Sequence, residues 1–292
     1  MKSLAAWKEG NTRQIHCAVI DNRLFKRTEI YRIVKNNKIL IILVTANLGV
    51  ATAFAAPAAR SDDDKFSLST GFDYNAGKYG TASTPDMLSI PVTSGYETGQ
   101  WMFKVAVPYA RVPRTSGLAP GIGPVRADGA ARDTQPDFGD PVAAASYNIY
   151  SGRASTFGID LTGKVRLKAT DAGLDIGQND YAAQADAYQS FNKFTALGSV
   201  GYKVLGTPAG INMNKVIFGS FGGSYQLDDK MHGGVDLNLS QSPSLTGDGH
   251  RELTAYVSRN IGKNFKAKGY VLKGFSNGSP DSSLGAQVHY GF

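Results

Sequence analysis

The stretch Leu284-Gly-Ala-Gln-Val-His-Tyr-Gly-Phe292 alternates between two kinds of residue. Every second position, starting from Leu284, is apolar, and the positions between them hold glycine, Gln287 or His289. Because successive side chains of a β-strand point to opposite faces, this segment would have one apolar face and one polar or small face. Such a strand suits a position between lipid and water. The interpretation depends on whether the pattern recurs.

Related alternation recurs in segments of about ten residues, which are separated by clusters of Gly, Asp, Asn, Ser and Pro. In the clearest segment, Phe157, Ile159 and Leu161 alternate with Asp160 and Thr162. An edge strand of a soluble β-sandwich would also show one solvated polar face, so a single strand does not decide the fold. The predicted strands span residues 66–74, 88–96, 101–109, 140–150, 157–167, 179–190, 194–204, 216–227, 231–240, 251–260, 265–275 and 283–292.

The connections between these strands alternate in length. The short ones are 99–100, 151–154, 191–193, 228–230 and 261–264, and the long ones are 75–85, 110–138, 169–178, 205–215, 241–250 and 276–282. Short turns at one end, long loops at the other and an even strand number are typical of bacterial outer-membrane barrels, whereas a sandwich has no reason to sort its loops. We therefore predict an all-β fold: an antiparallel up-and-down transmembrane β-barrel of about 12 strands over residues 65–292.

Glycine occurs inside seven of the predicted strands, for example at Gly71, Gly201 and Gly285. Interior glycine weakens a flat sheet but is useful where a barrel wall curves.

The N-terminal region carries an export signal. Lys35 and Lys38 precede the apolar run Ile39-Leu-Ile-Ile-Leu-Val44, and Ala53-Phe54-Ala55 resembles a cleavage site. These features predict a signal peptide over residues 34–55. The alternative is a transmembrane anchor, but the strongly apolar part is shorter than the roughly 20 residues that a spanning helix needs.

Two segments flank the predicted signal peptide. Residues 1–33 are predicted to be an unstructured extension of the gene model, because a signal peptide lies at the N-terminus of its precursor. Residues 56–64 are predicted to be a periplasmic linker. Its acidic run Asp62-Asp63-Asp64 is interpreted as part of that linker rather than as a cation site.

Charge and cysteine content agree with export. Nine of the 31 Lys and Arg residues and three of the 24 Asp and Glu residues lie in 1–55, which leaves 22 basic and 21 acidic groups in the predicted mature chain. The net charge of +7 therefore does not describe that chain, and we expect no nucleic-acid partner. Cys17 is the only cysteine, so the predicted mature chain has no disulfide framework.

Three stretches resemble a known family. These are Ser94-Gly-Tyr-Glu-Thr-Gly-Gln-Trp-Met-Phe-Lys-Val-Ala-Val-Pro-Tyr109, Leu161-Thr-Gly-Lys-Val-Arg-Leu-Lys168 and Tyr270-Val-Leu-Lys-Gly-Phe-Ser-Asn-Gly-Ser-Pro-Asp281. They are similar to Gram-negative outer-membrane β-barrel transporters that are grouped with the phenol-degradation meta-pathway (MetA-like) proteins. The resemblance covers most of residues 64–292, and its strongest part is Gly274-Phe-Ser-x-Gly-Ser-Pro-Asp281.

The resemblance implies a porin-like barrel in the outer membrane of a Gram-negative bacterium, and a permeant that is a small, hydrophobic or aromatic compound. The other expected partners are outer-membrane lipid, lipopolysaccharide and the barrel-assembly machinery, to which many bacterial outer-membrane barrels present a terminal aromatic residue such as Phe292. The resemblance implies no catalytic residues and no cofactor.

The predicted inner face carries ionisable side chains. About eight strands leave an interior filled by side chains and 16–18 leave an open channel, so twelve strands allow a narrow pore or a plugged lumen. The lysines and the arginine in this set would attract anions if they cluster, or would neutralise nearby carboxylates if they do not. The candidate lumen-lining residues are Lys104, Asp160, Lys164, Arg166, Asp186, His232, Asp236, Glu252, Lys266 and Lys268.

The long connection 110–138 is a second candidate region, because loops beyond roughly 12–15 residues are usually functional or disordered. It holds Arg111, Arg114, Arg126 and Arg132. The loop could form a constriction inside the barrel, bind lipopolysaccharide phosphates through its guanidinium groups, or have no specific role.

No catalytic constellation is found. Downstream of residue 55 the histidines are His232, His250 and His289, and no G-x-S-x-G elbow or zinc-ligand spacing accompanies them. We expect no catalytic, metal or cofactor site. Three hypotheses remain, in order: a passive outer-membrane channel for small molecules, a structural or surface-interaction barrel without transport, and a membrane-embedded lipid-modifying enzyme.

Overall fold

The computed structural model describes residues 64–78, 86–111, 118–119, 123–124, 137–151, 156–167, 179–206, 213–243 and 247–292. The chain divides between Ile42 and Leu43, and all the described residues belong to the second part. The predicted extension (1–33), the signal peptide (34–55) and all but the last residue of the linker (56–64) lie outside the described residues and stay predictions.

Twelve long antiparallel strands form the barrel wall. They are β1 (Lys65–Ala76), β2 (Asp86–Thr98), β3 (Trp101–Arg111), β7 (Val142–Ser151), β8 (Phe157–Arg166), β9 (Asp180–Phe191), β10 (Phe194–Val204), β11 (Val216–Gln226), β12 (Met231–Ser240), β13 (His250–Ile261), β14 (Phe265–Gly274) and β15 (Ser282–Gly291). Each of these strands is within two residues of its predicted bounds. The prediction of about 12 strands is confirmed.

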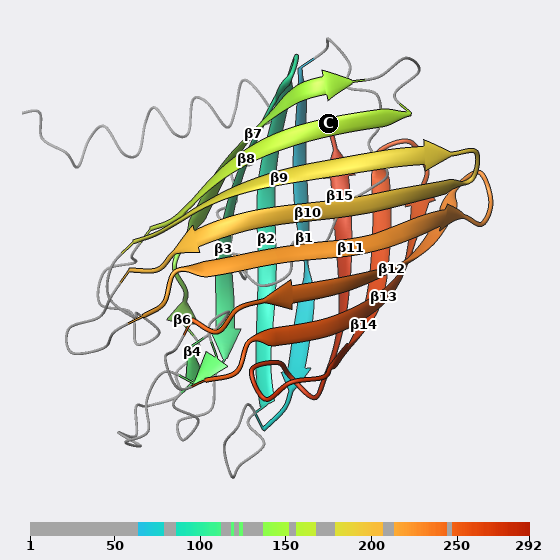
Figure 1. The fold of residues 1–292 in the computed structure, drawn as a ribbon. Coiled ribbons are helices and arrows are strands. Elements are labelled where there is room, and N and C mark those ends of the chain that lie inside the picture. The colour runs from blue at the N-terminus through green and yellow to red at the C-terminus, as the bar shows by residue number, and fades with distance from the viewer. Residues whose placement is uncertain are drawn as a thin grey trace, which may run out of the picture. The chain divides into compact units, whose positions relative to one another are not determined.

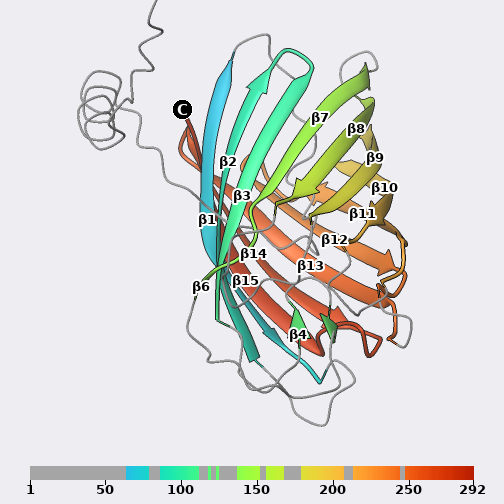
Figure 2. The same ribbon diagram turned by 90° about the vertical axis from the view of Figure 1, so that its left-hand side faces the viewer.

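The strands pair in chain order, and the sheet closes on itself. β1 pairs with β15 from Ser67↔Gly291 to Ala76↔Ser282, and β2 pairs with both β1 and β3. The remaining neighbours follow the chain from β3 through β7 to β15. Figures 1 and 2 show the strands tilted around a common interior. The architecture is a closed, antiparallel up-and-down barrel without helices among the described residues.

The two faces of the wall differ sharply, and β13 shows this best. Glu252, Thr254, Tyr256 and Ser258 are buried, and every residue between them is exposed. The register extends this alternation to the other strands, because paired residues point to the same side of a sheet. The outward set consists of exposed apolar residues such as Phe221, Val271 and Leu284. An apolar outer band of this kind is suited to lipid.

Three of the short turns contain a residue with positive φ. Gly99 (φ 51°) follows β2, Asn192 (φ 58°) follows β9, and Gly262 (φ 76°) follows β13. Glycine and asparagine tolerate this left-handed conformation, which a tight hairpin requires. β1 begins and β15 ends at the same end of the barrel as these turns.

Outward aromatic rings gather where β15 meets its neighbours. The rings of Phe66 and Phe292 have centroids 5.3 Å apart, those of Tyr290 and Phe292 4.8 Å, and those of Phe265 and Tyr290 4.7 Å. The Phe292 N–H donates to the Phe66 carbonyl at 2.9 Å. These contacts fasten β1, β14 and β15 together at the short-turn end.

The described residues of the expected long loop 110–138 include three short strands that the sequence does not reveal. β4 (Leu118–Ala119) pairs with β5 (Gly123–Pro124), and β6 (Asp137–Phe138) pairs with Tyr109 and Ala110 of β3. In the less regular fourth strand, the β7–β8 register shifts between Asn148 and Tyr150. This bulge moves Ile149 and Tyr150 out of strict alternation, which explains the weak sequence pattern.

No helix in the described parts of the chain is long and apolar enough to cross a membrane.

Candidate functional site

The ten candidate lumen-lining residues all lie on the face opposite the exposed apolar band. Their positions follow from the strand register, as in Lys104↔Ala144↔Lys164 across β3, β7 and β8. They are distributed over β3, β8, β9, β12, β13 and β14, and so surround the interior instead of forming one wall. The structure therefore brings them to a common face but not to a common cluster.

One side of the interior holds a continuous hydrogen-bonded chain, which we call the polar wall: Ser146, Thr162, Lys164, Gln184 and Asp186 of β7, β8 and β9. Lys164 Nζ donates to Gln184 Oε1 at 2.7 Å, and Gln184 Nε2 donates to Asp186 Oδ1. Thr162 Oγ1 donates to Asp186 Oδ2 at 3.4 Å and lies 2.8 Å from Ser146 Oγ. Each charge on this wall is thus balanced through neighbouring polar groups.

A buried ion pair continues the polar wall toward the long-loop end. Arg166 Nη2 lies 2.6 Å from Asp180 Oδ2, and Arg166 Nε lies 3.7 Å from Asp140. The Gly206 N–H donates to Asp180 Oδ1 at 2.7 Å. Asp180 is 1% exposed, and Lys203 lies close enough to interact with it electrostatically. Sequence reasoning identified Arg166 but missed Asp180 and Lys203, although both occupy positions of their strands whose side chains point inward.

The opposite side of the interior is different, and we call it the aromatic wall: Gly234, Tyr256, Lys268, Tyr270 and Gly285 of β12 to β15. Tyr256 pairs with Tyr270, and each ring lies over a glycine of its other neighbour strand. Lys268 is 4% exposed, and its Nζ lies 4.2 Å from the centroid of the Tyr256 ring. This geometry is a buried cation–π contact.

The aromatic–glycine contact repeats around half the barrel. In four directly paired positions, a Cβ atom on the glycine would overlap the aromatic ring of the facing residue. The pairs are Gly158–Tyr188, Gly201–Phe218, Gly234–Tyr256 and Gly285–Tyr270. Here glycine provides space for a ring that lies along the wall, which is a different reason from wall curvature. These glycine–aromatic pairs can be recognised in the sequence only when the register of the strands is known.

The third part of the interior, on β1 to β3, has small side chains such as Ser69, Thr93 and Gly95. Lys104 belongs to this part and is exposed although it points inward. Lys104, Lys266 and Glu97 all lie close enough to His289 to interact with it electrostatically. Two lysines and one carboxylate therefore meet near the short-turn end.

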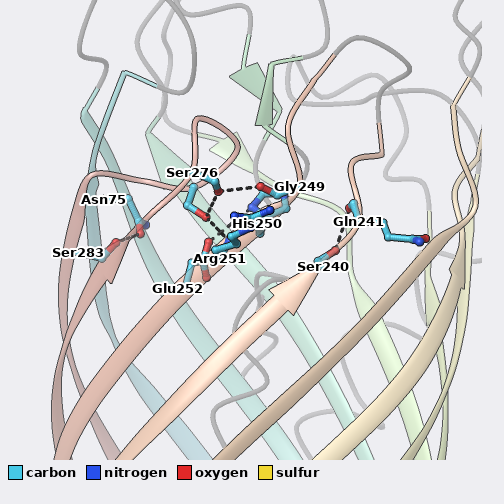
Figure 3. A network of polar contacts seen from close by, with 10 residues as sticks. Asn75, Ser240, Gln241, Gly249, His250, Arg251, Glu252, Ser276 and Ser283 are labelled. Carbon is cyan, nitrogen blue, oxygen red and sulfur yellow. Dashed lines mark hydrogen bonds and ion pairs between the residues drawn. The ribbon is translucent and has the colours of Figure 1, made fainter.

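At the long-loop end, short polar contacts join the start of β13 to the segment that follows β14 (Figure 3). Ser276 Oγ donates to the Gly249 carbonyl at 2.7 Å, and the Arg251 N–H donates to Ser279 Oγ at 3.0 Å. His250 Nδ1 lies 3.4 Å from Glu252 Oε1. These contacts hold the segment that the family resemblance singled out, 274–281, in a compact fold, so its residues have a structural role.

The remaining candidates are placed as follows. Arg111 ends β3, and Arg114, Arg126 and Arg132 lie outside the described residues. His232 lies near Lys266 and Asp228, and Asp236 lies near Lys268. Within the described residues, no group of three or more His, Cys, Asp or Glu side chains is arranged to hold a metal ion.

No protein-family model and no curated protein matches this chain, so the family resemblance stays a prediction. Solved structures do match. The COG4313 outer-membrane channel from Pseudomonas putida F1 has a TM-score of 0.60 and 10% identity, over 83% of this chain and 99% of that one. The NanC porin has a TM-score of 0.50 and 10% identity, over 76% of this chain and 98% of that one.

At these identities the likeness concerns the fold alone. The first of these solved structures is an outer-membrane channel, and the second is a porin. The chain therefore has the fold of an outer-membrane β-barrel channel, with a closed wall of 12 strands and a polar interior.

Proposed function

We propose that this protein is a passive channel for small molecules in the outer membrane of a Gram-negative bacterium. The observation that carries the proposal is the inner face, where the ten ionisable candidates lie on six strands and the inward Lys104 is exposed to solvent. An exposed lysine on the inner face needs water beside it. A lumen that admits water at this level is what a diffusion pore requires.

The ten inward candidates are proposed to line the permeation path. Lys164 and Asp186 are fixed by hydrogen bonds in the polar wall, and Lys268 is held against Tyr256. Groups that are paired in this way present a polar surface with little net charge. We therefore propose a weakly selective pore rather than a strongly anion-selective or cation-selective one.

The proposed permeants are small compounds with hydrophobic or aromatic character. The family resemblance supports this class, and so do the buried apolar residues on the inner face of β3 and β7, Ala106 and Val142. Outer-membrane lipid, lipopolysaccharide, and an assembly machinery that would recognise Phe292 are proposed as the other partners.

Planar-bilayer recording of the refolded barrel tests the channel. We expect discrete conductance steps from folded protein and none from protein that has been unfolded by boiling in detergent. Gel migration before and after boiling serves as the control for folding, because closed barrels resist detergent until heated. Folded protein that inserts but carries no current would contradict the proposal.

A barrel without transport is the second candidate. The buried Arg166–Asp180 pair and the covered rings of Tyr256 and Tyr270 favour it, since they fill space inside the wall. It predicts insertion into bilayers without ion current, so the same recording distinguishes the two functions.

A further inference from the structure

The outward side of the barrel wall carries very little charge, and the exceptions are confined to two neighbouring strands. Among the outward strand residues whose side chains the structure describes, the only charged ones are Arg251 and Arg259 of β13 and Lys273 of β14. All three are exposed. A cation that faces hydrocarbon loses its hydration, so such a residue needs a position at the membrane surface and an anionic partner.

Arg251 and Lys273 lie at the long-loop end of the wall. Lys273 is eight residues along β14 from Phe265, and Arg251 is ten residues along β13 from Ile261, at the short-turn end. With a rise of about 3.3 Å per residue and a strand tilt of roughly 40°, these separations correspond to about 20–25 Å along the membrane normal. The apolar band of an outer-membrane barrel is about 25 Å tall, so both cations lie at its far edge.

These two cations are diagonal neighbours in the β13–β14 pair. Lys273 pairs with Leu253, two residues from Arg251, which places the Cα atoms of the two basic residues about 7–8 Å apart. Ser282 of β15 pairs with Lys273 from the other side and is also exposed. At this spacing a guanidinium, an ammonium and a hydroxyl group can all donate to one anion. We call Arg251, Lys273 and Ser282 the basic rim.

The described part of the chain does not balance the charge of the basic rim. Within the described residues neither Arg251 nor Lys273 forms an ion pair, and the outward strand positions with described side chains hold no Asp or Glu. The inward cations differ, since Arg166 is paired with Asp180. The anion that balances the basic rim therefore has to come from the membrane.

The segment 274–281 holds the backbone of the basic rim in place. The Arg251 N–H donates to Ser279 Oγ at 3.0 Å, and the Arg251 carbonyl accepts from the Phe275 N–H at 2.8 Å. A Cβ atom on Gly274 would overlap the Pro280 carbonyl, so the segment is packed closely at this point. A site whose backbone is fixed before binding loses less conformational entropy when its ligand binds.

We propose that the basic rim binds a phosphate group of lipopolysaccharide in the outer leaflet of the membrane. The long loops of outer-membrane barrels face the outside of the cell, where lipopolysaccharide forms the leaflet. The phosphate oxygens accept from Arg251, Lys273 and Ser282, and the acyl chains lie against the exposed Leu253 and Val271 below. This inference rests on the outer-membrane location of the proposed channel, and it does not depend on transport.

Native mass spectrometry of the full chain, refolded in detergent without lipopolysaccharide, tests the site. The probe is diphosphorylated lipid A, the membrane anchor of lipopolysaccharide. We expect Arg251→Gln combined with Lys273→Gln to weaken lipid A binding by about tenfold or more, because each variant position loses a charge-assisted hydrogen bond. Lys273→Arg keeps the charge and should bind lipid A as the wild type does. Arg259→Gln, an outward arginine of the same strand at the short-turn end, is the matched control and should leave binding unchanged.

Two further probes identify the source of the phosphate. Phosphatidylglycerol should bind the wild type about tenfold more weakly than lipid A, because a phosphomonoester carries a charge of about −1.5 to −2 at neutral pH and the phosphodiester carries less. Inorganic phosphate should not displace bound lipid A. Phosphatidylglycerol that binds as tightly as lipid A, or displacement by inorganic phosphate, would overturn the assignment to lipopolysaccharide.

The remaining outcomes separate the site from the channel. Equal lipid A binding by the wild type and the double variant, or an equal loss in Arg259→Gln, overturns the site. Where gel migration shows that the double variant does not fold, Lys273→Gln alone decides, and unchanged binding there also overturns the site. The double variant should carry the same bilayer current as the wild type. A wild type that binds lipid A but carries no current overturns the channel and leaves the site.

Discussion

The polar wall and the aromatic wall lie on opposite sides of the barrel, with β8 six strands from β14 in the closed order. The polar wall is held by hydrogen bonds that connect charged groups across three strands. The aromatic wall is held by shape, since each tyrosine ring occupies the space above a glycine. The first arrangement depends on matched partners, and the second depends on the absence of a side chain.

The difference predicts how each wall fails. Removing one partner from the polar wall leaves a buried charge or donor without compensation, which is expensive in a medium of low dielectric constant. Adding a single carbon to the aromatic wall pushes a ring into the lumen. The polar wall should therefore be sensitive to loss of atoms and the aromatic wall to their addition.

The largest effect is expected from Asp180→Ala. It leaves the guanidinium of Arg166 buried without its carboxylate, which should lower the free energy of unfolding by about 3–5 kcal/mol. Urea unfolding in detergent micelles measures this. Asp229→Ala, in an exposed short turn, is the control and should change stability by less than about 0.5 kcal/mol. Arg166→Leu combined with Asp180→Leu should recover much of the loss, and an additive result would contradict the pairing.

Gly285→Ala should lower the free energy of unfolding by about 1–3 kcal/mol, because the new methyl group overlaps the Tyr270 ring. The same methyl group at Gly269, which has open space around its Cα, is the matched control and should be nearly neutral. Equal stability of the two variants would show that the ring does not depend on the glycine. The temperature at which the folded gel band disappears gives a second measurement.

Thr162→Val keeps the shape of the side chain but removes the hydroxyl that connects Ser146 and Asp186. We expect a loss of about 0.5–1.5 kcal/mol in unfolding free energy, the usual contribution of an internal hydrogen bond. Thr70→Val on the outward face of β1 is the control, and it should be neutral or stabilising in lipid. An unchanged unfolding free energy of the Thr162→Val variant would show that the polar wall is not held by these hydrogen bonds.

Lys104 belongs to neither wall, so Lys104→Glu should change stability least, by less than about 0.5 kcal/mol. Its effect should appear in ion selectivity, because the exposed side chain faces the proposed path. We expect the reversal potential in a salt gradient to shift toward cation preference. Lys193→Glu in the short turn after β9 is the control. An unchanged reversal potential with normal current would place the ion path away from Lys104.

The alternation of residues along the strands, together with the alternating lengths of the connections, was enough to predict the barrel. Residues such as Leu161 and Lys164 differ so much in hydration free energy that the outward and inward faces can be assigned within a single strand. The short turns were predictable for the same local reason, with Gly99 and Gly262 at positions that require positive φ. The inward position of the ten candidates follows from parity alone.

The partners of those residues could not be predicted, because they come from other strands. Three such contacts are consequences of the register: Tyr270 covers Gly285, Arg166 meets Asp180, and Pro91 faces Pro108. A strand carries its own period of two, but it does not contain the offset to its neighbour. The sequence by itself determined which face of the regular strands is apolar, and tertiary structure alone decided which inward side chains neutralise or support one another.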